Sequence, residues 1–319
     1  MSSQATPCVG IDVSKKHLDV HLLPDNRSLR VLNSRDGIRE LLGQLPTPGS
    51  CRVIAEATGG YQRLLVAELV SAGHTVSVVN PRQVRDFARA DNRLAKTDKI
   101  DARTLARFGQ VFELRTVEQT SESQGELQQL VAHRRNLIGV RTAQQNRLDT
   151  QTSKAVCKSL REMLTLLGTQ IAETEEAINR LVEQDDDWKS RSKILRSVPG
   201  VGPTTAASLM ADLPELGKLD RQAVGALAGL APFNRDSGQF KGKRSIWGGR
   251  ASVRTSLYMA TLTARRINPV IRAFADRLES AGKPFKVMMT ACMRKLLVIL
   301  NTMVKTKTLW NPKLVPQNP

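Results

Sequence analysis

The stretch KTDKIDARTLARF, residues 96–108, places two aspartates three positions apart among basic side chains. In a helix Asp98 and Asp101 lie one turn apart on the same face, where two like charges destabilise the helix slightly. The neighbouring lysine and arginine side chains could neutralise both aspartates at a solvated helix start. Alternatively, the two carboxylates could hold a cation, and the choice depends on what the rest of the chain brings to this helix.

The first third of the chain is predicted to be α/β. Short apolar or alternating runs separated by turn residues indicate strands, and runs with helical spacing end at glycine or proline. Asp36 is the expected cap of the first helix. The predicted order is strands 8–13 and 17–23, a weak strand near 30–33, helix 36–45, strand 52–58, helix 61–73, strand 74–80, a helix after Pro81 and the helix that holds the two aspartates.

This order is that of the ribonuclease-H-like fold, in which the first strand, the fourth strand and a late helix converge at one edge of the sheet. Asp12 lies on the first strand, Glu56 ends the fourth, and Asp98 and Asp101 open the late helix. Four carboxylates at one edge could not all stay ionised without a cation. Hard oxygen ligands suit Mg²⁺ or Mn²⁺, and such ions clamp a phosphodiester during strand cleavage. Taken singly, Asp12 could instead bind a backbone turn, and Glu56 could pair with a nearby arginine.

The chain of 319 residues is strongly basic, with 48 lysines and arginines against 30 acidic residues and a net charge of +18. Residues 1–115 hold 17 basic and 12 acidic side chains, residues 116–187 hold 8 and 12, and residues 188–319 hold 23 and 6. The excess therefore lies in the last part, which indicates a polyanionic partner such as nucleic acid.

The cysteines and the apolar runs indicate a cytoplasmic protein. Cys8, Cys51, Cys157 and Cys292 are widely spaced, as expected of idle thiols in a reducing compartment. There is no N-terminal signal peptide pattern. The apolar run near residues 287–300 contains two basic residues and is expected to be too short to span a membrane.

The middle of the chain is predicted to be a helical coiled coil. Apolar residues and one threonine recur there at alternating spacings of four and three, which fits a helical hairpin or a coiled coil between two chains equally well. The predicted domains are therefore an α/β domain at 1–115, a coiled-coil linker at 116–187 and a mostly α-helical basic domain at 188–319. The seam consists of Leu160, Leu164, Leu167, Ile171, Thr174, Ile178 and Leu181.

The basic domain has two candidate nucleic-acid contacts. In SVPGVGPTTAASLM, Gly200 and Gly202 predict a tight turn before a helix that opens at Pro203 or Thr204, where backbone N–H groups could hold a phosphate; an ordinary capped turn is the alternative. Residues 233–254 are glycine-rich and predict a loop that follows a nucleic-acid backbone. Its candidate phosphate contacts are Arg235, Lys241, Lys243, Arg244, Arg250 and Arg254, and Trp247 is either a core anchor or a platform for base stacking.

Six strings together carry a family resemblance over nearly the whole chain. They resemble those of the insertion-sequence transposases that have a RuvC-like DEDD domain and a C-terminal serine-bearing transposase domain, a family related to the Piv DNA invertases. The strings are GIDVSK (10–15), EATGGY (56–61), KTDKIDARTLAR (96–107), PGVGPTTAASL (199–209), GLAPFNRDSG (229–238) and GKRSIWGGRASVRTSLY (242–258).

The resemblance implies that Asp12, Glu56, Asp98 and Asp101 form the DEDD tetrad and that Ser237 is the nucleophile. It also implies a site-specific DNA recombinase of a bacterial or archaeal mobile element, which uses a structured bridge RNA to choose target and donor DNA. In such a family, dimers assemble into a tetramer in which the carboxylates of one protomer serve the serine of its neighbour.

A serine hydroxyl is a weak nucleophile and needs a base or a metal to activate it. All four histidines of the chain precede residue 134, so a Ser–His pair within the basic domain is excluded. Activation of Ser237 would therefore come from the carboxylates of the other domain. Ser245 and Ser252 are the alternative nucleophiles.

Three other functions compete with recombination. The string VGIDVSKK resembles a phosphate loop of actin-like ATPases and sugar kinases, but the second glycine-rich loop and the adenosine pocket of those enzymes are missing from the sequence. A metal-dependent nuclease that resembles a Holliday-junction resolvase would use the carboxylates with water and leave Ser237 structural. A nucleic-acid-binding scaffold with a decayed site is the third alternative.

Overall fold

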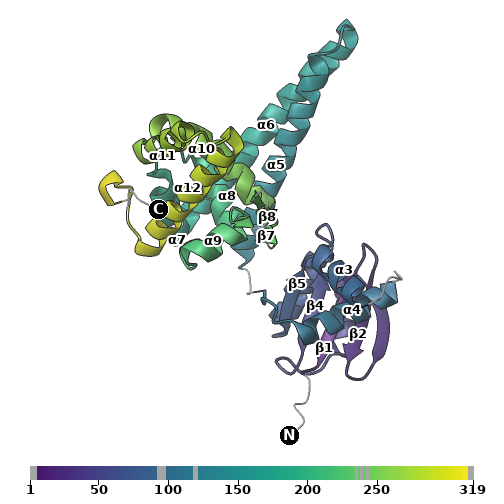
Figure 1. The fold of residues 1–319 in the computed structure, drawn as a ribbon. Helices are drawn as coiled ribbons and strands as arrows, with labels where there is room; N and C mark the ends of the chain where they lie inside the picture. Colours follow the sequence, from purple (N-terminus) through teal and green to yellow (C-terminus); the bar gives the residue numbers. More distant parts are fainter. Residues whose placement is uncertain are drawn as a thin grey trace. The chain divides into compact units, whose positions relative to one another are not determined.

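The computed structural model describes residues 6–91, 98–117, 121–233, 236–237, 240–241 and 244–314. The chain divides into two compact units, Met1–Ser121 and Glu122–Pro319, and each is described by itself (Figure 1).

The first unit is built on a mixed sheet of five strands in the order β3-β2-β1-β4-β5. β1 is antiparallel to β2, and β2 to β3, whereas β1, β4 and β5 run parallel. This confirms the predicted ribonuclease-H-like arrangement, although β3 begins three residues earlier than expected. The strands are β1 (Cys8–Val13), β2 (His17–Leu23), β3 (Arg27–Leu32), β4 (Arg52–Glu56) and β5 (Thr75–Val79).

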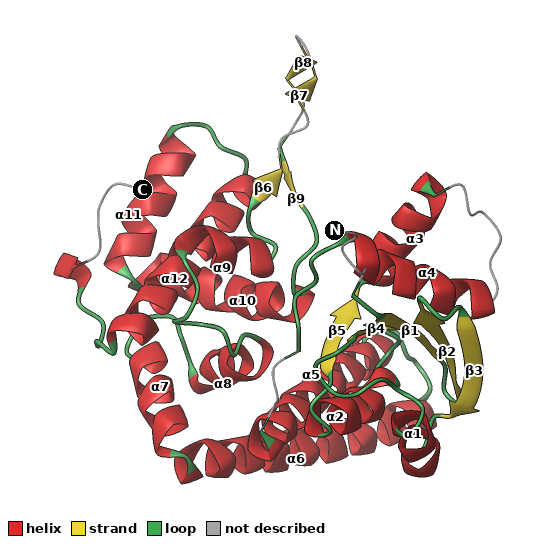
Figure 2. Ribbon diagram, turned by 90° about the horizontal axis from the view of Figure 1, so that it is seen from below, coloured by secondary structure: helices red, strands yellow, loops and turns green. Residues whose placement is uncertain are grey.

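Helices cover the sheet of the first unit, as Figure 2 shows. They are α1 (Arg35–Leu42), α2 (Gln62–Ser71), α3 (Pro81–Ala90) and α4 (Asp98–Val111). The cap of α1 is Ser34, whose side chain accepts from the Gly37 amide, and the predicted cap Asp36 lies in the first turn instead. Val84 of α3 and Leu105 of α4 belong to one buried cluster with Ile54 of β4. Ile11 of β1 belongs to a second cluster with Leu65 and Leu69 of α2. The sheet therefore has two packed faces, one of which belongs to α4.

The second unit is mostly helical. Two long helices, α5 (Glu122–Leu148) and α6 (Lys154–Gln184), form an antiparallel hairpin in which Leu137 packs with Leu167 and Ile171 (Figure 1). The apolar seam of the sequence is therefore partnered within one chain, and a supercoil between chains stays a prediction. The remaining helices are α7 (Asp186–Arg196), α8 (Pro203–Asp212), α9 (Arg221–Leu227), α10 (Ala251–Ile267), α11 (Pro269–Ser280), α12 (Phe285–Thr306) and the 3₁₀ turn η1 (Pro312–Leu314).

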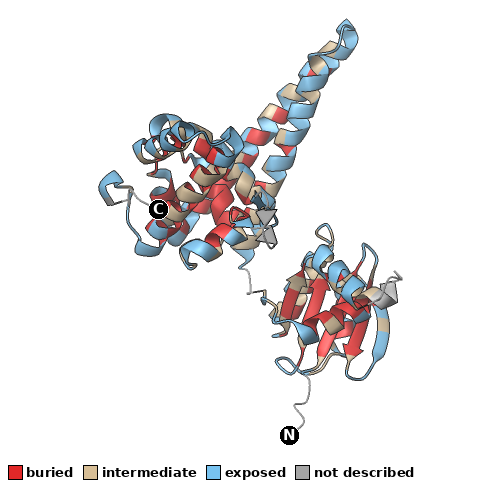
Figure 3. Cartoon of the chain, viewed as in Figure 1, coloured by how far each residue is buried: buried red, intermediate tan, exposed pale blue. Residues whose placement is uncertain are grey.

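The base of the hairpin and the C-terminal helices share one core. Leu127 and Ile178 of the hairpin belong to the same buried cluster as Leu257 of α10 and Leu296 of α12. Figure 3 shows the buried residues concentrated in these helices, while the far end of the hairpin is mostly exposed. The helices predicted for residues 116–187 therefore belong to the same compact unit as the basic region that follows them.

Helix α12 corrects the expected reason for excluding a membrane span. With 22 residues it is long and apolar enough to cross a bilayer by length and composition, so the run is not too short. Its most apolar window is 61% buried inside the protein, and residues such as Leu297 and Leu300 are fully covered. α12 is therefore the central core helix of the second unit. All four cysteines are free thiols, as predicted.

The glycine-rich segment forms two short strand pairs rather than a loop. β6 (Pro232–Phe233) pairs with β9 (Ser245–Ile246), and β7 (Asp236–Ser237) pairs with β8 (Phe240–Lys241). In Figure 2 the β7–β8 pair extends away from the helices of its unit. Each strand has only two residues, which is too short for a pattern of alternation to predict.

Candidate metal centre and nucleophile

Asp12 and Glu56 occupy equivalent places at the carboxyl ends of two neighbouring parallel strands. Ile11 of β1 pairs with Ala55 of β4, and each carboxylate residue directly follows one member of that pair. Successive residues of a strand alternate between faces, so Asp12 and Glu56 project from the same face of the sheet. Both side chains are half-buried.

Helix α4 packs on that face and runs antiparallel to β1. A Cβ atom added to Gly10 would overlap the backbone of Ala102 and Ala106, whereas one added to Gly109 would overlap the side chain of Ile54 and lie 3.7 Å from Sγ of Cys8, at the start of β1. Gly10 and Ile54 each lie two residues before a carboxylate, on the same face of the sheet.

The axis of α4 therefore crosses β1 with its C-terminal end near the start of the strand and its first turn near the end of the strand. The strand advances about 6.6 Å from residue 10 to residue 12, and a helix covers that length in about four residues. Since residues 102 and 106 lie over Gly10, residues 98–101 are level with Asp12. Asp98 is the first residue of α4, and Asp101 is half-buried one turn later.

Two neighbours of this edge were missed by sequence reasoning. Asp19 of β2 stands directly opposite Asp12 and is 5% exposed, and both of its oxygens accept from Arg30 of β3 at 2.8 Å. His21 stands opposite Gly10, and its pKa is lowered by burial and by the charge of Arg103. The alternation HLDVH, which places Asp19 and His21 on one face, is the signal that could have found them.

The donor set fits a hard divalent cation, because Asp12, Glu56 and Asp101 offer carboxylate oxygens from one face. Among the side chains that the structure describes, which do not include that of Asp98, no group of three or more His, Cys, Asp or Glu residues is close enough to hold a metal. Like-charged carboxylates repel one another and draw together only around a cation. The two strands and the helix thus bring the backbones of these residues toward one edge, and the metal site itself stays a prediction.

Ser237 is the last residue of β7, and its backbone pairs with Phe240 of β8. It therefore lies beside the turn of a two-stranded ribbon. The side chain of Ser237 and those of Lys241 and Lys243 lie outside the described part of the structure, as does Arg235 altogether. Of the alternative nucleophiles, Ser245 is exposed on β9 and Ser252 is half-buried in the first turn of α10.

The remaining candidate phosphate contacts divide into structural and exposed residues. Arg250 donates from both Nη atoms to the carboxylate of Glu215, at 2.6 and 2.7 Å, and Arg254 donates to the carbonyl oxygens of Ala228 and Gly248. These bonds give Arg250 a structural role within the fold, and a phosphate contact by Arg250 stays a prediction. Arg244 is exposed.

Trp247 is 57% exposed, which rules out the alternative that it anchors the core. Its indole ring is amphipathic and large enough to cover a nucleobase. The role of a stacking platform therefore stays a prediction for Trp247.

The predicted turn before α8 is present. Gly200 has φ +101°, and a Cβ there would overlap Ala264 of α10, so this glycine permits close packing. Gly202 is exposed, and α8 begins at Pro203 as predicted.

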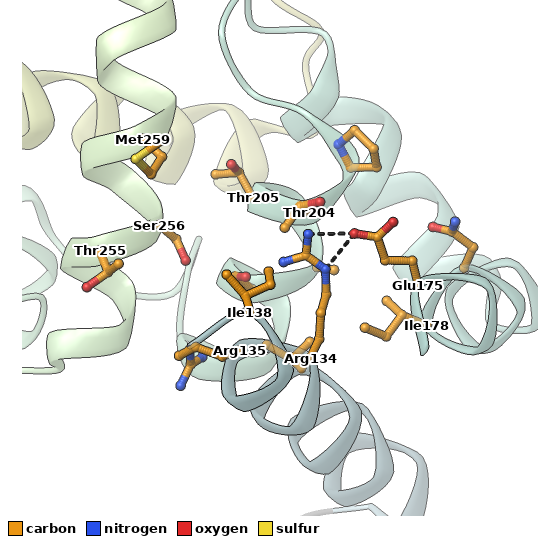
Figure 4. Close-up of a pocket in the computed structure, with 15 residues that line it drawn as sticks. Arg134, Arg135, Ile138, Glu175, Ile178, Thr204, Thr205, Thr255, Ser256 and Met259 are labelled. Carbon is orange, nitrogen blue, oxygen red and sulfur yellow. Dashed lines mark hydrogen bonds and ion pairs between the residues drawn. The ribbon is translucent and has the colours of Figure 1, made fainter. Parts of the chain in front are cut away.

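Figure 4 shows the pocket of about 250 Å³ beside this helix start, bounded by α5, α6, α8 and α10. Arg134 pairs there with Glu175, and Arg135 pairs with Asp212. Both pocket-lining arginines are therefore in ion pairs, and phosphate binding at this helix start would depend on backbone N–H groups.

Two family models, both of transposases, match this chain. A model of the DEDD transposase domain of the IS110 type matches residues 9–156, and the model described as "Transposase IS116/IS110/IS902 family" matches residues 192–276. The chain belongs to the IS110/IS116 family of transposases. It is therefore a DNA-processing enzyme with a RuvC-like DEDD domain.

Similar proteins include the pilin gene-inverting protein of Moraxella bovis, which is 28% identical over 93% of this chain and 95% of its own. A probable family 20 transposase of Pseudomonas aeruginosa is 24% identical over 95% of this chain and 98% of its own. Among solved structures, T. thermophilus RuvC in complex with a Holliday junction substrate aligns with 35% of this chain and 99% of that chain, with 15% identity and a TM-score of 0.26.

In this IS110/IS116 transposase the candidate residues fall within the two matched regions. Asp12, Glu56, Asp98 and Asp101 lie in the segment matched by the DEDD model, and Ser237 lies in the segment matched by the second model.

Proposed function

We propose that this transposase is a site-specific DNA recombinase of a mobile element, in which the four carboxylates hold Mg²⁺ or Mn²⁺ and Ser237 attacks a DNA phosphate. The observation that carries the proposal is that the first turn of α4 lies level with Asp12 at the end of β1. That placement follows from the packing of Gly10 against Ala102.

Asp12, Glu56, Asp98 and Asp101 are the residues that would hold the cation. A bound divalent cation stabilises the negative charge that develops on a phosphodiester during displacement. The chain itself contributes the placement of the carboxylates on two rigid strands and one packed helix. The Asp19–Arg30 pair beside Asp12 adds a neutralised carboxylate, so the edge gains no further repulsive charge from Asp19.

In the covalent step, Oγ of Ser237 forms a bond to phosphorus while the bond from phosphorus to one deoxyribose oxygen breaks. The hydroxyl proton of the serine passes to a base, and the departing deoxyribose oxygen takes up a proton. Rejoining reverses the step with an oxygen of a different strand as the nucleophile. One phosphoester bond replaces another at each step, so no external energy source is required.

The base for Ser237 is proposed to come from the DEDD edge. No histidine occurs in residues 188–319, and the carboxylates belong to the other compact unit. The carboxylates of a neighbouring protomer would serve the serine in a tetramer built from two dimers. The hairpin of α5 and α6 is the proposed contact between protomers, because Val140, Met163 and Leu166 remain exposed on it.

Double-stranded target and donor DNA are the proposed substrates, and a structured bridge RNA is the proposed guide. The basic excess of residues 188–319 supports a nucleic-acid partner. The name of the Moraxella bovis relative says that it inverts a gene, which is a rearrangement in which cut strands are rejoined. Aromatic residues are 4% of the chain, too few to read a long site by stacking, which supports a guide that pairs with the DNA.

The test is a recombination assay with the full chain, its copurifying RNA, Mg²⁺ and DNA that carries the ends of the element. Asp12→Asn and Asp101→Asn should lose joined products by about a hundredfold or more while still binding DNA. The matched control is Asp36→Asn, which changes an exposed carboxylate of α1 in the same unit. Ribonuclease treatment before assembly should abolish selection of the target.

Two outcomes would reject the proposal. Free cut ends without joined products would indicate a metal-dependent nuclease. Binding without any cutting by the wild type would indicate a scaffold with a decayed site.

A further inference from the structure

A basic pocket in the second unit involves neither the carboxylates nor Ser237. It has a volume of about 550 Å³ and is bounded by α11, α12 and η1. Its lining includes Phe274, Arg277, Lys295 and Lys313, together with Pro269 and Pro312. Three of these residues are cationic, and none of the described residues that line the pocket is acidic.

Phe274 holds two of the cations at the pocket. The guanidinium carbon of Arg277 lies 5.1 Å from the centre of the Phe274 ring, and Nζ of Lys295 lies 4.6 Å from it. Both are within the range of a cation–π interaction, which restrains the two charges without neutralising them. Within the described ranges, none of Arg277, Lys295 and Lys313 forms an ion pair.

The walls of the pocket are fixed by the fold. Lys295 lies on α12 next to the fully buried Leu296, so its backbone cannot shift without disturbing the core. The segment that leads to η1 is tied to the end of α7, because the Trp310 amide donates to Oγ of Ser197 at 2.9 Å. Within the segment the Lys313 amide donates to Oδ1 of Asn311 at 3.0 Å.

The charges in this hollow are not compensated. Burial and the charge of Arg277 lower the pKa of Lys295, which is the effect expected where cations face one another without an anion. An arginine fork and two ammonium groups together match the oxygens of a phosphate group.

The apolar part of the lining narrows the class of ligand. Phe274, Pro269 and Pro312 offer surfaces against which a sugar or a base can pack. A volume of about 550 Å³ is in the range of sites for a single small molecule, so one nucleotide unit fits whereas a duplex does not.

We propose that this pocket binds the phosphate and the adjoining sugar or base of one unpaired nucleotide in a DNA or RNA strand. This goes beyond the proposed recombination chemistry, since the pocket involves neither the carboxylates nor Ser237. It would hold a displaced DNA strand or an unpaired RNA segment while other parts of the enzyme act.

The test measures the binding of fluorescently labelled 12-nucleotide single strands of DNA and of RNA to the full chain by fluorescence anisotropy. The variants are Arg277→Met, Lys295→Met and Lys313→Met. The matched control is Arg272→Met, which removes the same charge from an exposed position of α11 outside the pocket.

Each pocket variant should weaken binding of at least one strand type by about tenfold and reduce the salt dependence by about one ion per strand. The control should change the affinity less than about twofold. A preference for DNA or for RNA in this comparison identifies the source of the nucleotide. Arg277 and Lys313 are exposed, so these variants stay informative if Lys295→Met lowers the melting temperature.

Two results would overturn the proposal. The first is equal affinity for single strands in the pocket variants and in Arg272→Met. The second is displacement of the labelled strand by inorganic phosphate or a nucleoside monophosphate at the same concentration as the strand, which would make this a site for a small free ligand. Covalent crosslinking of a 5-iodouracil strand to the peptide containing Phe274 provides independent support, and its loss in Arg277→Met is the expected result.

Discussion

Gly10 of β1 lies directly against the backbone of Ala102 in α4, so close that a Cβ atom at residue 10 would overlap the Ala102 carbonyl oxygen. This contact fixes how far α4 sits from the sheet and which of its turns faces the end of β1. Asp12 follows Gly10 by two residues, and Asp101 directly precedes Ala102. The glycine therefore positions the two aspartates relative to each other without touching a ligand.

Substituting Gly10→Ala should push α4 away from the sheet. We expect the free energy of unfolding to fall by about 1–3 kcal/mol, as for other overpacked cores, and recombination to fall much further. The measurement is chemical denaturation combined with the recombination assay. Gly139→Ala is the control, because nothing lies within 4 Å of a Cβ at that exposed position of α5, and alanine favours a helix. Equal losses of stability and of recombination in Gly10→Ala and Gly139→Ala would contradict the positioning role of Gly10.

Magnesium should raise the melting temperature of the wild type, since an ion that binds only the folded state stabilises it by mass action. Asp12→Asn should lose most of this rise, because the amide offers one fewer charged oxygen ligand to the ion. Differential scanning calorimetry with and without Mg²⁺ measures both effects. A rise of the same size in Asp12→Asn would show that the stabilising ion binds elsewhere.

Arg250 and Arg244 should separate into a structural and a binding role. Arg250→Ala removes the two hydrogen bonds from Arg250 to the carboxylate of Glu215, which is 15% exposed, and should cost about 1–3 kcal/mol of stability. Arg244→Ala, at an exposed position, should change stability by less than about 0.5 kcal/mol and weaken DNA binding. Thermal melts and DNA-binding isotherms of the two variants measure these two effects. The reverse pattern would contradict these roles.

Stability should fall as the pH drops below about 6.5. Burial lowers the pKa of His21 and of His74 below their ordinary value of 6.5, so the unfolded state binds more protons than the folded state in this range. Their contribution to stability is present above that pH and is lost as the pH falls through the folded pKa values. Denaturation between pH 5 and 8 should show a shallower pH dependence in the double variant His21→Gln/His74→Gln. An unchanged dependence of stability on pH in the double variant would show that other groups cause the loss of stability at low pH.

Much of the first unit was predictable because its elements are long and regular. The run 17–23 alternates as a strand does, and the apolar runs 8–13 and 52–56 are short enough for strands, so Asp12 and Glu56 could be placed on them directly. The side of α4 that faces the sheet was harder to predict, because it depends on which small residues, such as Gly10, allow close approach. Asp19–Arg30 was missed because the sequence does not fix the register in which β2 pairs with β3.

The second unit was less predictable. Its apolar seam could not distinguish a partner helix in the same chain from one in another chain, since packing against either buries the same side chains. Arg250 was assigned to phosphate from its neighbourhood in sequence, whereas its partner Glu215 lies 35 residues away. Long-range pairing of this kind leaves no local pattern.

The most direct test of the central claim is to trap and map the covalent intermediate. The full chain with its RNA, Mg²⁺ and end-bearing DNA is quenched in denaturant, digested with nuclease and protease, and analysed by mass spectrometry. The proposed mechanism predicts a nucleotide attached to the peptide containing Ser237, absent in Ser237→Ala and in Asp101→Ala. An adduct on Ser245 or Ser252, or cut DNA ends that persist in Ser237→Ala without any adduct, would contradict it.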